Sequence, residues 1–114
     1  MKKRGIINAQ LAGLIAGLGH KDTFMIGDGG MPIPKGVEIV DLALCGGVPT
    51  FRQVMDAILD EAEIEQYTIA NEIEEKNPEL LAYIREKLPN AEWNMVPHTE
   101  LKEMSRNDEV CRGC

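Results

Sequence analysis

The sequence predicts an α/β domain in which helices flank a mostly parallel β-sheet. Three observations favour this class. The chain has 114 residues, which is enough for one hydrophobic core. Short apolar runs bounded by turn residues are typical of buried strands, and longer segments carry apolar residues at helical spacing. These two kinds of segment alternate along the chain, and such alternation is typical of parallel strands joined by helical crossovers.

The first helix is predicted over residues 8–18. Asn8 can cap its start, and Gly19 can end it. Four apolar residues have the i, i+3, i+4, i+7 spacing that places them on a single helical face: Leu11, Leu14, Ile15 and Leu18. Residues 23–28 and 37–44 are predicted to form two strands, because both are short and apolar and a loop rich in Gly and Pro separates them.

A second helix is predicted to begin after Thr50. Thr50 and Gln53 have the spacing of a capping box, in which each residue caps the other. One face of this helix would then hold Val54, Ile58 and Ala62. Residues 64–73 are expected to form a strand, although their charged side chains leave a helix open.

The last third of the chain repeats the pattern of helix and strand. Residues 77–88 are predicted to be helical, because Asn77 can cap the start and Pro78 suits the first helical position. The apolar face of this helix holds Leu80, Leu81, Ile84 and Leu88. Residues 91–97 are predicted to form a strand, and residues 98–105 a short helix.

The composition excludes several classes of partner. The chain has 12 Lys and Arg against 19 Asp and Glu, a net charge of −7, and its basic cluster is confined to residues 2–4. This disfavours non-specific binding to nucleic acid. The apolar runs are far shorter than the ~20 residues that a membrane helix needs, and no secretory signal is indicated. The chain has three cysteines and no disulfide framework, so we expect a cytoplasmic protein. From the charge and the short apolar runs we expect no nucleic-acid partner and no membrane partner.

Two histidines and one carboxylate lie at junctions between predicted elements. His20 follows the Gly that ends the first helix, Asp28 ends the first strand, and His98 follows the last strand. Ligands of open parallel sheets collect where strands end and loops begin, and imidazole and carboxylate groups transfer protons near neutral pH. From this pattern alone an enzyme and a binding module both stay open, because loop histidines often only cap a turn or face solvent.

Other charged and reactive residues have plainer interpretations. The Glu-rich segments 61–65 and 72–75 are typical of solvated faces, and so is Lys102 one helical turn after His98. The chain contains neither a GxGxxG motif nor a P-loop. We therefore expect no cofactor bound through such a loop.

The cysteines do not indicate a metal site. Cys111 and Cys114 form a CxxC without a second pair, and Cys45 is the remaining thiol. A structural zinc site needs four ligands. A redox CxxC opens a helix after a strand, whereas this one lies at the end of the chain. No metal is expected.

Four stretches resemble the D-ribose pyranase family, which is related to the fucose mutarotases. Residues 2–22 resemble the family's N-terminus, including its G-H-x-D. Residues 28–34, "DGGMPIP", resemble its D-x-G-x-P-x-P loop. Residues 40–59 resemble the strand, G-V-P turn and helix that follow, and residues 97–105 resemble the segment with its second histidine. The combination, in register over residues 2–110, is specific.

The resemblance implies a cofactor-independent isomerase that interconverts the pyranose and furanose forms of a free sugar, with D-ribose the first choice. It implies that His20 is the catalytic proton donor, that Asp28 and His98 contact the sugar, and that Lys102 lies near the same pocket. A fucose-type mutarotase and a non-catalytic sugar-binding or transport-accessory protein of the same family stay open as alternatives.

The resemblance also implies a Rossmann-like layered fold and a homo-oligomer, as a decamer of two pentameric rings with sites at subunit boundaries. We expect one domain over residues 1–114 that lacks the family's C-terminal arm and strand, because "VCRGC" stands at residues 110–114 where the family continues into them. A six- to seven-residue strand spans ~20 Å. His20 and Asp28 can therefore share a ligand only if residues 19–22 fold back, or if they meet across a subunit boundary.

Overall fold

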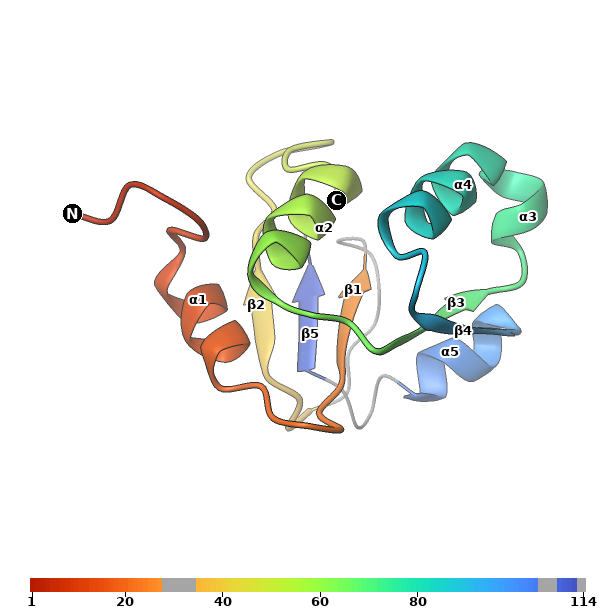
Figure 1. Cartoon of the computed structure of the whole chain (residues 1–114), viewed down its shortest axis with the longest axis horizontal. Coiled ribbons are helices and arrows are strands. Elements are labelled where there is room, and N and C mark those ends of the chain that lie inside the picture. Colours follow the sequence, from red (N-terminus) through yellow and green to blue (C-terminus); the bar gives the residue numbers. More distant parts are fainter. Residues whose placement is uncertain (28–34, 105–108, 113–114) are drawn as a thin grey trace. The chain divides into compact units, whose positions relative to one another are not determined.

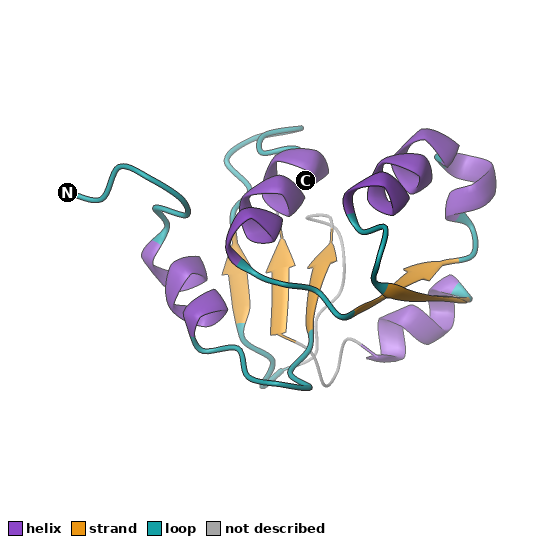
Figure 2. Ribbon diagram, viewed as in Figure 1, coloured by secondary structure: helices purple, strands orange, loops and turns teal. Residues whose placement is uncertain are grey.

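The computed structural model describes residues 1–27, 35–104 and 109–112 (Figure 1). These residues form two compact units, one built from residues 1–62 with the strand at 109–112 and one from residues 63–104. All three described strand pairs are parallel. The predicted α/β class with parallel strands is confirmed, although the strands form two sheets rather than one (Figure 2).

The first unit holds a three-stranded sheet and two helices. Its helices are α1 (Ala9–Ala16) and α2 (Phe51–Glu61), and its strands are β1 (Phe24–Gly27), β2 (Ile39–Asp41) and β5 (Glu109–Arg112). The sheet order is β1-β5-β2, so a strand from near the end of the chain lies at the centre of the sheet (Figure 1). The sequence interpretation contains no strand at this place.

Both helices of this unit begin at the predicted caps. The Asn8 side-chain oxygen accepts a hydrogen bond from the backbone N–H of Leu11 at 2.9 Å. The capping box of α2 is complete, because Thr50 Oγ1 accepts from the Gln53 backbone N–H at 3.2 Å and Gln53 Oε1 accepts from the Thr50 backbone N–H at 2.9 Å. Each contact satisfies an N–H that the helix itself leaves without an acceptor.

Helix α1 ends earlier than predicted. Gly17, rather than Gly19, follows the last helical residue, and its N–H donates to the Gly13 carbonyl at 3.0 Å. The helix stops at the first Gly after its buried face, because Gly is a poor helix former. The side chain of Gln10 then links α1 to β2 by donating to the carbonyl of Ile39 at 2.8 Å.

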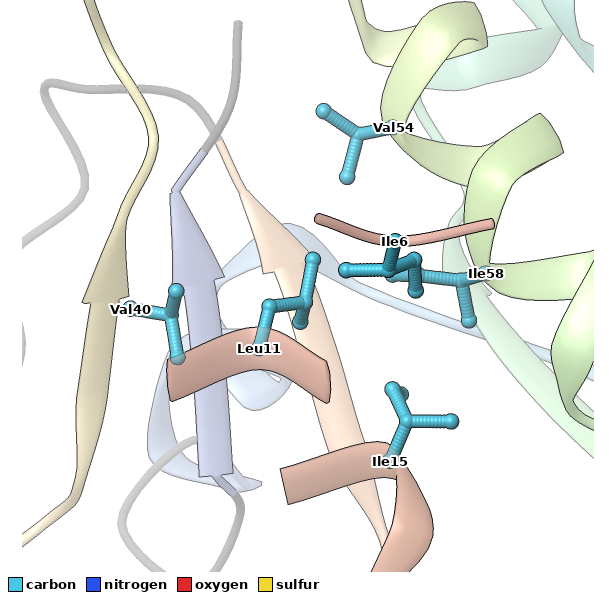
Figure 3. Close-up of a cluster of buried hydrophobic side chains, with 6 residues drawn as sticks. All are labelled: Ile6, Leu11, Ile15, Val40, Val54 and Ile58. Atoms are coloured by element: carbon cyan, nitrogen blue, oxygen red, sulfur yellow. The ribbon is translucent and has the colours of Figure 1, made fainter. Parts of the chain in front are cut away.

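A cluster of buried apolar side chains forms the core of the first unit (Figure 3). They come from the N-terminal segment, α1, β2 and α2: Ile6, Leu11, Ile15, Val40, Val54 and Ile58. Val40 and Ile58 are only 1% exposed. The half-buried Phe24 and Ile26, which alternate along β1 and so share one face of the sheet, pack against this cluster.

Glu61 fastens the segment before α1 to the end of α2. Its Oε1 accepts from the backbone N–H of Ile6 at 3.2 Å and lies 3.8 Å from Nζ of Lys2, which donates to the Ile6 carbonyl at 2.8 Å. Gly5 has a φ of +68°, and a Cβ at this position would collide with the same carboxylate. Glu61 is exposed, as the sequence predicts, and its side chain also organises the N-terminal segment.

The second unit holds two parallel strands and three helices. Its elements are β3 (Gln66–Ala70), α3 (Ile73–Lys76), α4 (Pro78–Lys87), β4 (Glu92–Val96) and α5 (His98–Met104). Helix α5 packs against β3, and α3 packs against α4. Both strands and both longer helices form where the sequence predicts them, except that the strand predicted over residues 64–73 ends at Ala70. Helix α3, an additional single turn, begins at residue 73.

Helix α4 shows why these elements form where they do. The Asn77 side-chain oxygen accepts from the backbone N–H of Leu80 at 3.1 Å, and Pro78 occupies the first turn. Leu81 and Ile84 are buried, as the helical spacing predicts. Arg85 of the same helix lies over the ring of Trp93 in β4, 4.7 Å from its centroid.

Candidate functional site

His20 lies in a tight turn between α1 and β1. The backbone N–H of Gly19 donates to Oδ2 of Asp22 at 2.7 Å, and the N–H of Asp22 donates back to the Gly19 carbonyl at 3.2 Å. Lys21, between them, has a φ of +73°. These contacts hold the backbone of His20 from both sides, while His20 itself is exposed.

Asp28, the second predicted site residue, lies outside the described residues. The strand before it begins at Phe24 and ends at Gly27, so His20 precedes the amino end of β1. Ligands of parallel sheets usually collect at the carboxyl ends of the strands. His20 thus lies at the other end of this strand, and its shared site with Asp28 stays a prediction.

His98 is the first residue of α5 and lies just beyond the carboxyl end of β4, as predicted. Pro97 precedes the helix, and its carbonyl accepts from the N–H groups of Glu100 at 3.0 Å and Leu101 at 3.1 Å. His98 is exposed. Lys102 lies one turn further along α5.

A carboxylate from the neighbouring strand end contacts the backbone of His98. Oε2 and Oε1 of Glu72 accept from the His98 N–H at 3.2 and 3.4 Å. The strand register explains this contact: Ala70 pairs with Val96, and the N–H of Asn71 continues the ladder by donating to the Val96 carbonyl at 2.8 Å. The residues two positions beyond each strand therefore meet.

Hydrogen bonds lower the pKa of the Glu72 carboxyl, first from its own backbone N–H and then from that of His98. Partial burial opposes this lowering, and electrostatic interactions with His98 and Lys76 lower the pKa further. Glu72 is therefore ionised at neutral pH. Residues 72–75 are predicted to form a solvated face, and Glu72 makes this contact in addition. The signal that could have found the contact is the parallel register of the two predicted strands.

A shallow hollow of about 420 Å³ lies beside α1 in the first unit. Residues of α1 and of the turn that follows it line the hollow, together with Asp22 and Glu38. Neither His20 nor His98 lines it. The hollow therefore does not coincide with the predicted site.

The described part of the chain offers no group of three or more His, Cys, Asp or Glu side chains arranged to hold a metal ion. Cys45 is exposed in the loop before α2. Cys111 lies in β5, and Cys114 falls outside the described residues. Of the helices that the structure describes, none is long and apolar enough to span a bilayer.

The chemistry available at the described positions is proton transfer and hydrogen bonding. His20 presents an imidazole from a constrained turn, and His98 presents one at a strand end. An imidazole gains and loses a proton near neutral pH and can hydrogen-bond a hydroxyl in either state. A small polyhydroxylated solute suits such groups.

Comparison with known proteins identifies relatives over nearly the whole chain. The sequence profile of the RbsD / FucU transport protein family matches residues 1–112. The D-ribose pyranase of Limosilactobacillus fermentum is 44% identical over 103 residues, which are 90% of this chain and 79% of the relative. That of Streptomyces avermitilis is 48% identical over 107 residues, 94% of this chain and 81% of the relative.

A solved structure is similar as well. The structure of Bacillus subtilis RbsD complexed with D-ribose matches 99% of this chain and 87% of its own chain, with a TM-score of 0.91 and 34% sequence identity. The sequence resemblance to the D-ribose pyranase family and the α/β fold class are both confirmed by these matches.

Proposed function

Since this chain belongs to the RbsD / FucU transport protein family, we propose that it is an isomerase that interconverts the pyranose and furanose forms of D-ribose. The observation that carries the proposal is its identity of 44 to 48% with proteins named D-ribose pyranase, over nine-tenths of the chain or more. Its similarity to a structure complexed with D-ribose supports the same sugar.

The reaction needs only proton transfer. A proton leaves the anomeric hydroxyl, the bond between C1 and the ring oxygen breaks, and the ring oxygen takes up a proton. The open-chain aldehyde then closes again when a different hydroxyl attacks C1, through O5 for the pyranose and through O4 for the furanose. Atoms and electrons balance without an oxidant or reductant. Positioned acid and base groups accelerate such steps ~10²–10⁴-fold.

We assign the proton delivery to His20. An exposed imidazole on a backbone held by Gly19 and Asp22 supports this role, because a proton donor must be fixed relative to the ring oxygen. We assign Asp28 and His98 to the sugar hydroxyls, with Lys102 at the same pocket. The position of His98 beyond the carboxyl end of β4 supports its assignment.

We propose further that the sites are completed between copies in a homo-oligomer, a decamer of two pentameric rings. The four residues of β1 span roughly 13 Å, and His20 precedes this strand in the chain whereas Asp28 follows it. A neighbouring copy offers a direct way to bring the two residue types to one sugar. Sedimentation velocity checks this assembly, and a monomer at all concentrations would contradict it.

We also propose a cytoplasmic location, which suits the exposed thiol of Cys45.

The proposal is tested by NMR exchange spectroscopy on free D-ribose with substoichiometric protein. We expect faster exchange between pyranose and furanose signals than in buffer alone. Parallel spectra of L-fucose and of other pentoses define the substrate range. If no sugar exchanges faster, the chain is not an isomerase of this type.

A second function is favoured by the word transport in the family's name. A non-catalytic sugar-binding or transport-accessory protein would bind D-ribose without changing its ring exchange. Thermal unfolding with and without ribose separates the two functions: a rise in Tm together with an unchanged exchange rate would support the second.

A further inference from the structure

Glu72 and His98 approach each other because β3 and β4 are parallel and in register. The ladder runs from Gln66 opposite Glu92 to Ala70 opposite Val96. Both strands end at this last pair, and Glu72 and His98 are each two positions beyond it. A one-residue slip would offset Glu72 from His98, so the contact depends on the register of the whole strand pair.

Helix α5 has no side-chain cap from the residue that precedes it. Helices usually begin with a Ser, Thr, Asp or Asn whose side-chain oxygen accepts one of the first backbone N–H groups. The residue before α5 is Pro97, which has no side-chain acceptor. Glu72 supplies the oxygens instead, from the end of the adjacent strand, and the N–H that it accepts is that of His98.

This arrangement places a fixed anion on the backbone of a residue that the proposed function assigns to the sugar. Hydrogen bonds to an ionised acceptor are stronger than those between neutral groups. A carboxylate is also favourable at the amino end of a helix. Glu72 also interacts electrostatically with the imidazole of His98 and with the side chain of Lys76.

We propose that Glu72 is a positioning residue, whose carboxylate holds the backbone of His98 so that its imidazole is directed to the bound sugar. The inference rests on the proposed function, since it takes His98 as a sugar contact. It adds a residue that does not itself touch the sugar. Loss of Glu72 should therefore weaken the hold on the sugar and leave the proton transfer at His20 intact.

The experiment compares Glu72→Ala, Glu72→Gln, Glu75→Gln and His98→Ala with the unmodified protein. Glu75→Gln is the matched control, because Glu75 lies on α3 beside Glu72, is exposed, and keeps its own backbone hydrogen bond. Exchange spectroscopy at several ribose concentrations gives kcat and KM for each variant. Thermal unfolding reports whether each variant is folded.

We expect Glu72→Ala to raise KM about tenfold, which corresponds to losing the proposed hydrogen bond between His98 and the sugar, with kcat within about twofold of the unmodified value. Glu72→Gln keeps an oxygen acceptor for the His98 N–H and should stay within about threefold in KM. Glu75→Gln should match the unmodified protein. A purely structural role would lower Tm and the active fraction, and hence the apparent kcat, without this change in KM.

Each alternative result is decisive. An unchanged KM in Glu72→Ala together with a raised KM in His98→Ala overturns the inference and leaves the proposed function in place. An unchanged KM in both overturns the sugar contact at His98 and the inference with it. If the unmodified protein does not accelerate exchange, the proposed function fails, and the dissociation constant for ribose replaces KM in the same comparison. The inference then holds only if Glu72→Ala weakens binding and Glu75→Gln does not.

Discussion

Gly5 and Gly13 occupy contrasting environments. Gly5 has a positive φ of +68°, and the position of its absent Cβ is blocked by the carboxylate of Glu61. Gly13 lies within α1, and apart from the adjacent backbone of its own helix no atom lies within 4 Å of the place that its Cβ would take. A methyl group should therefore have opposite effects at the two positions.

Gly5→Ala should lower the free energy of unfolding by about 1–2 kcal/mol, because an L-residue at this φ is strained. The collision would also displace Glu61 from the N–H of Ile6. Gly13→Ala should raise the free energy of unfolding by about 0.5–1 kcal/mol through helix propensity. Urea unfolding of both variants measures the two effects. Equal effects of the same sign would show that the local backbone does not control stability here.

The lowered pKa of Glu72 predicts how the stability of the protein depends on pH. Its pKa in the folded state is lowered, so the stabilisation it provides is present above the pKa of the unfolded chain and is lost as pH falls through the folded pKa. The unmodified protein should be more stable than Glu72→Gln at pH 7, and this difference should shrink below about pH 4.5, near the ordinary pKa of Glu.

Chemical unfolding of both proteins at a series of pH values measures this difference. Glu75→Gln, at an exposed position in α3, provides the comparison for the loss of a negative charge alone. A difference between the unmodified protein and Glu72→Gln that stays constant from neutral to acid pH would contradict the assigned role of the carboxylate.

At the scale of an element, the start of helix α2 determines which of its residues pack into the core of its unit. Its capping box fixes where the helix begins, and this start sets which residues face the sheet. Val54 and Ile58 are both buried as a result. The cap therefore contributes to the packing shown in Figure 3 as well as to the helix itself.

Thr50→Ala should lower the free energy of unfolding by about 1 kcal/mol, because the Gln53 N–H loses its acceptor. Thr50→Ser keeps a hydroxyl and should lose much less. The two variants differ from each other only in groups at the cap, so the comparison isolates the hydrogen bond. Equal losses in urea unfolding would show that the hydroxyl does not stabilise the helix.

The elements that the sequence predicts best are those with local signals. Asn8, Thr50 and Asn77 each cap the helix that they were expected to begin, since a cap involves residues only three positions apart. Strand β5 carries no such signal, because it has four residues and takes its place only by pairing with β1 and β2 on both sides. Its central position is a property of the sheet and could not be predicted from Val110 and its neighbours.

The same distinction applies to the candidate site. His20 and His98 could be selected from the sequence, because the position of a histidine between two predicted elements can be recognised without a structure. The partnership of Glu72 with His98 could not, since 26 positions separate them and the strand register alone brings them together. Asp28 remains a prediction from the family motif.

At the scale of the whole molecule, the chain forms two α/β units, each with parallel strands. It belongs to a family whose members include proteins named D-ribose pyranase. His20 belongs to the first unit and His98 to the second. We propose that the chain opens and recloses a ribose ring, with His20 as the proton donor.

The measurement that tests this claim most directly is exchange spectroscopy of D-ribose with the unmodified protein and with His20→Ala side by side. We expect the unmodified protein to accelerate pyranose–furanose exchange, and His20→Ala to lose about 10²-fold or more of that acceleration while its Tm stays close to the unmodified value, because His20 is exposed. Equal acceleration by a folded His20→Ala, or none by either protein, would contradict the account.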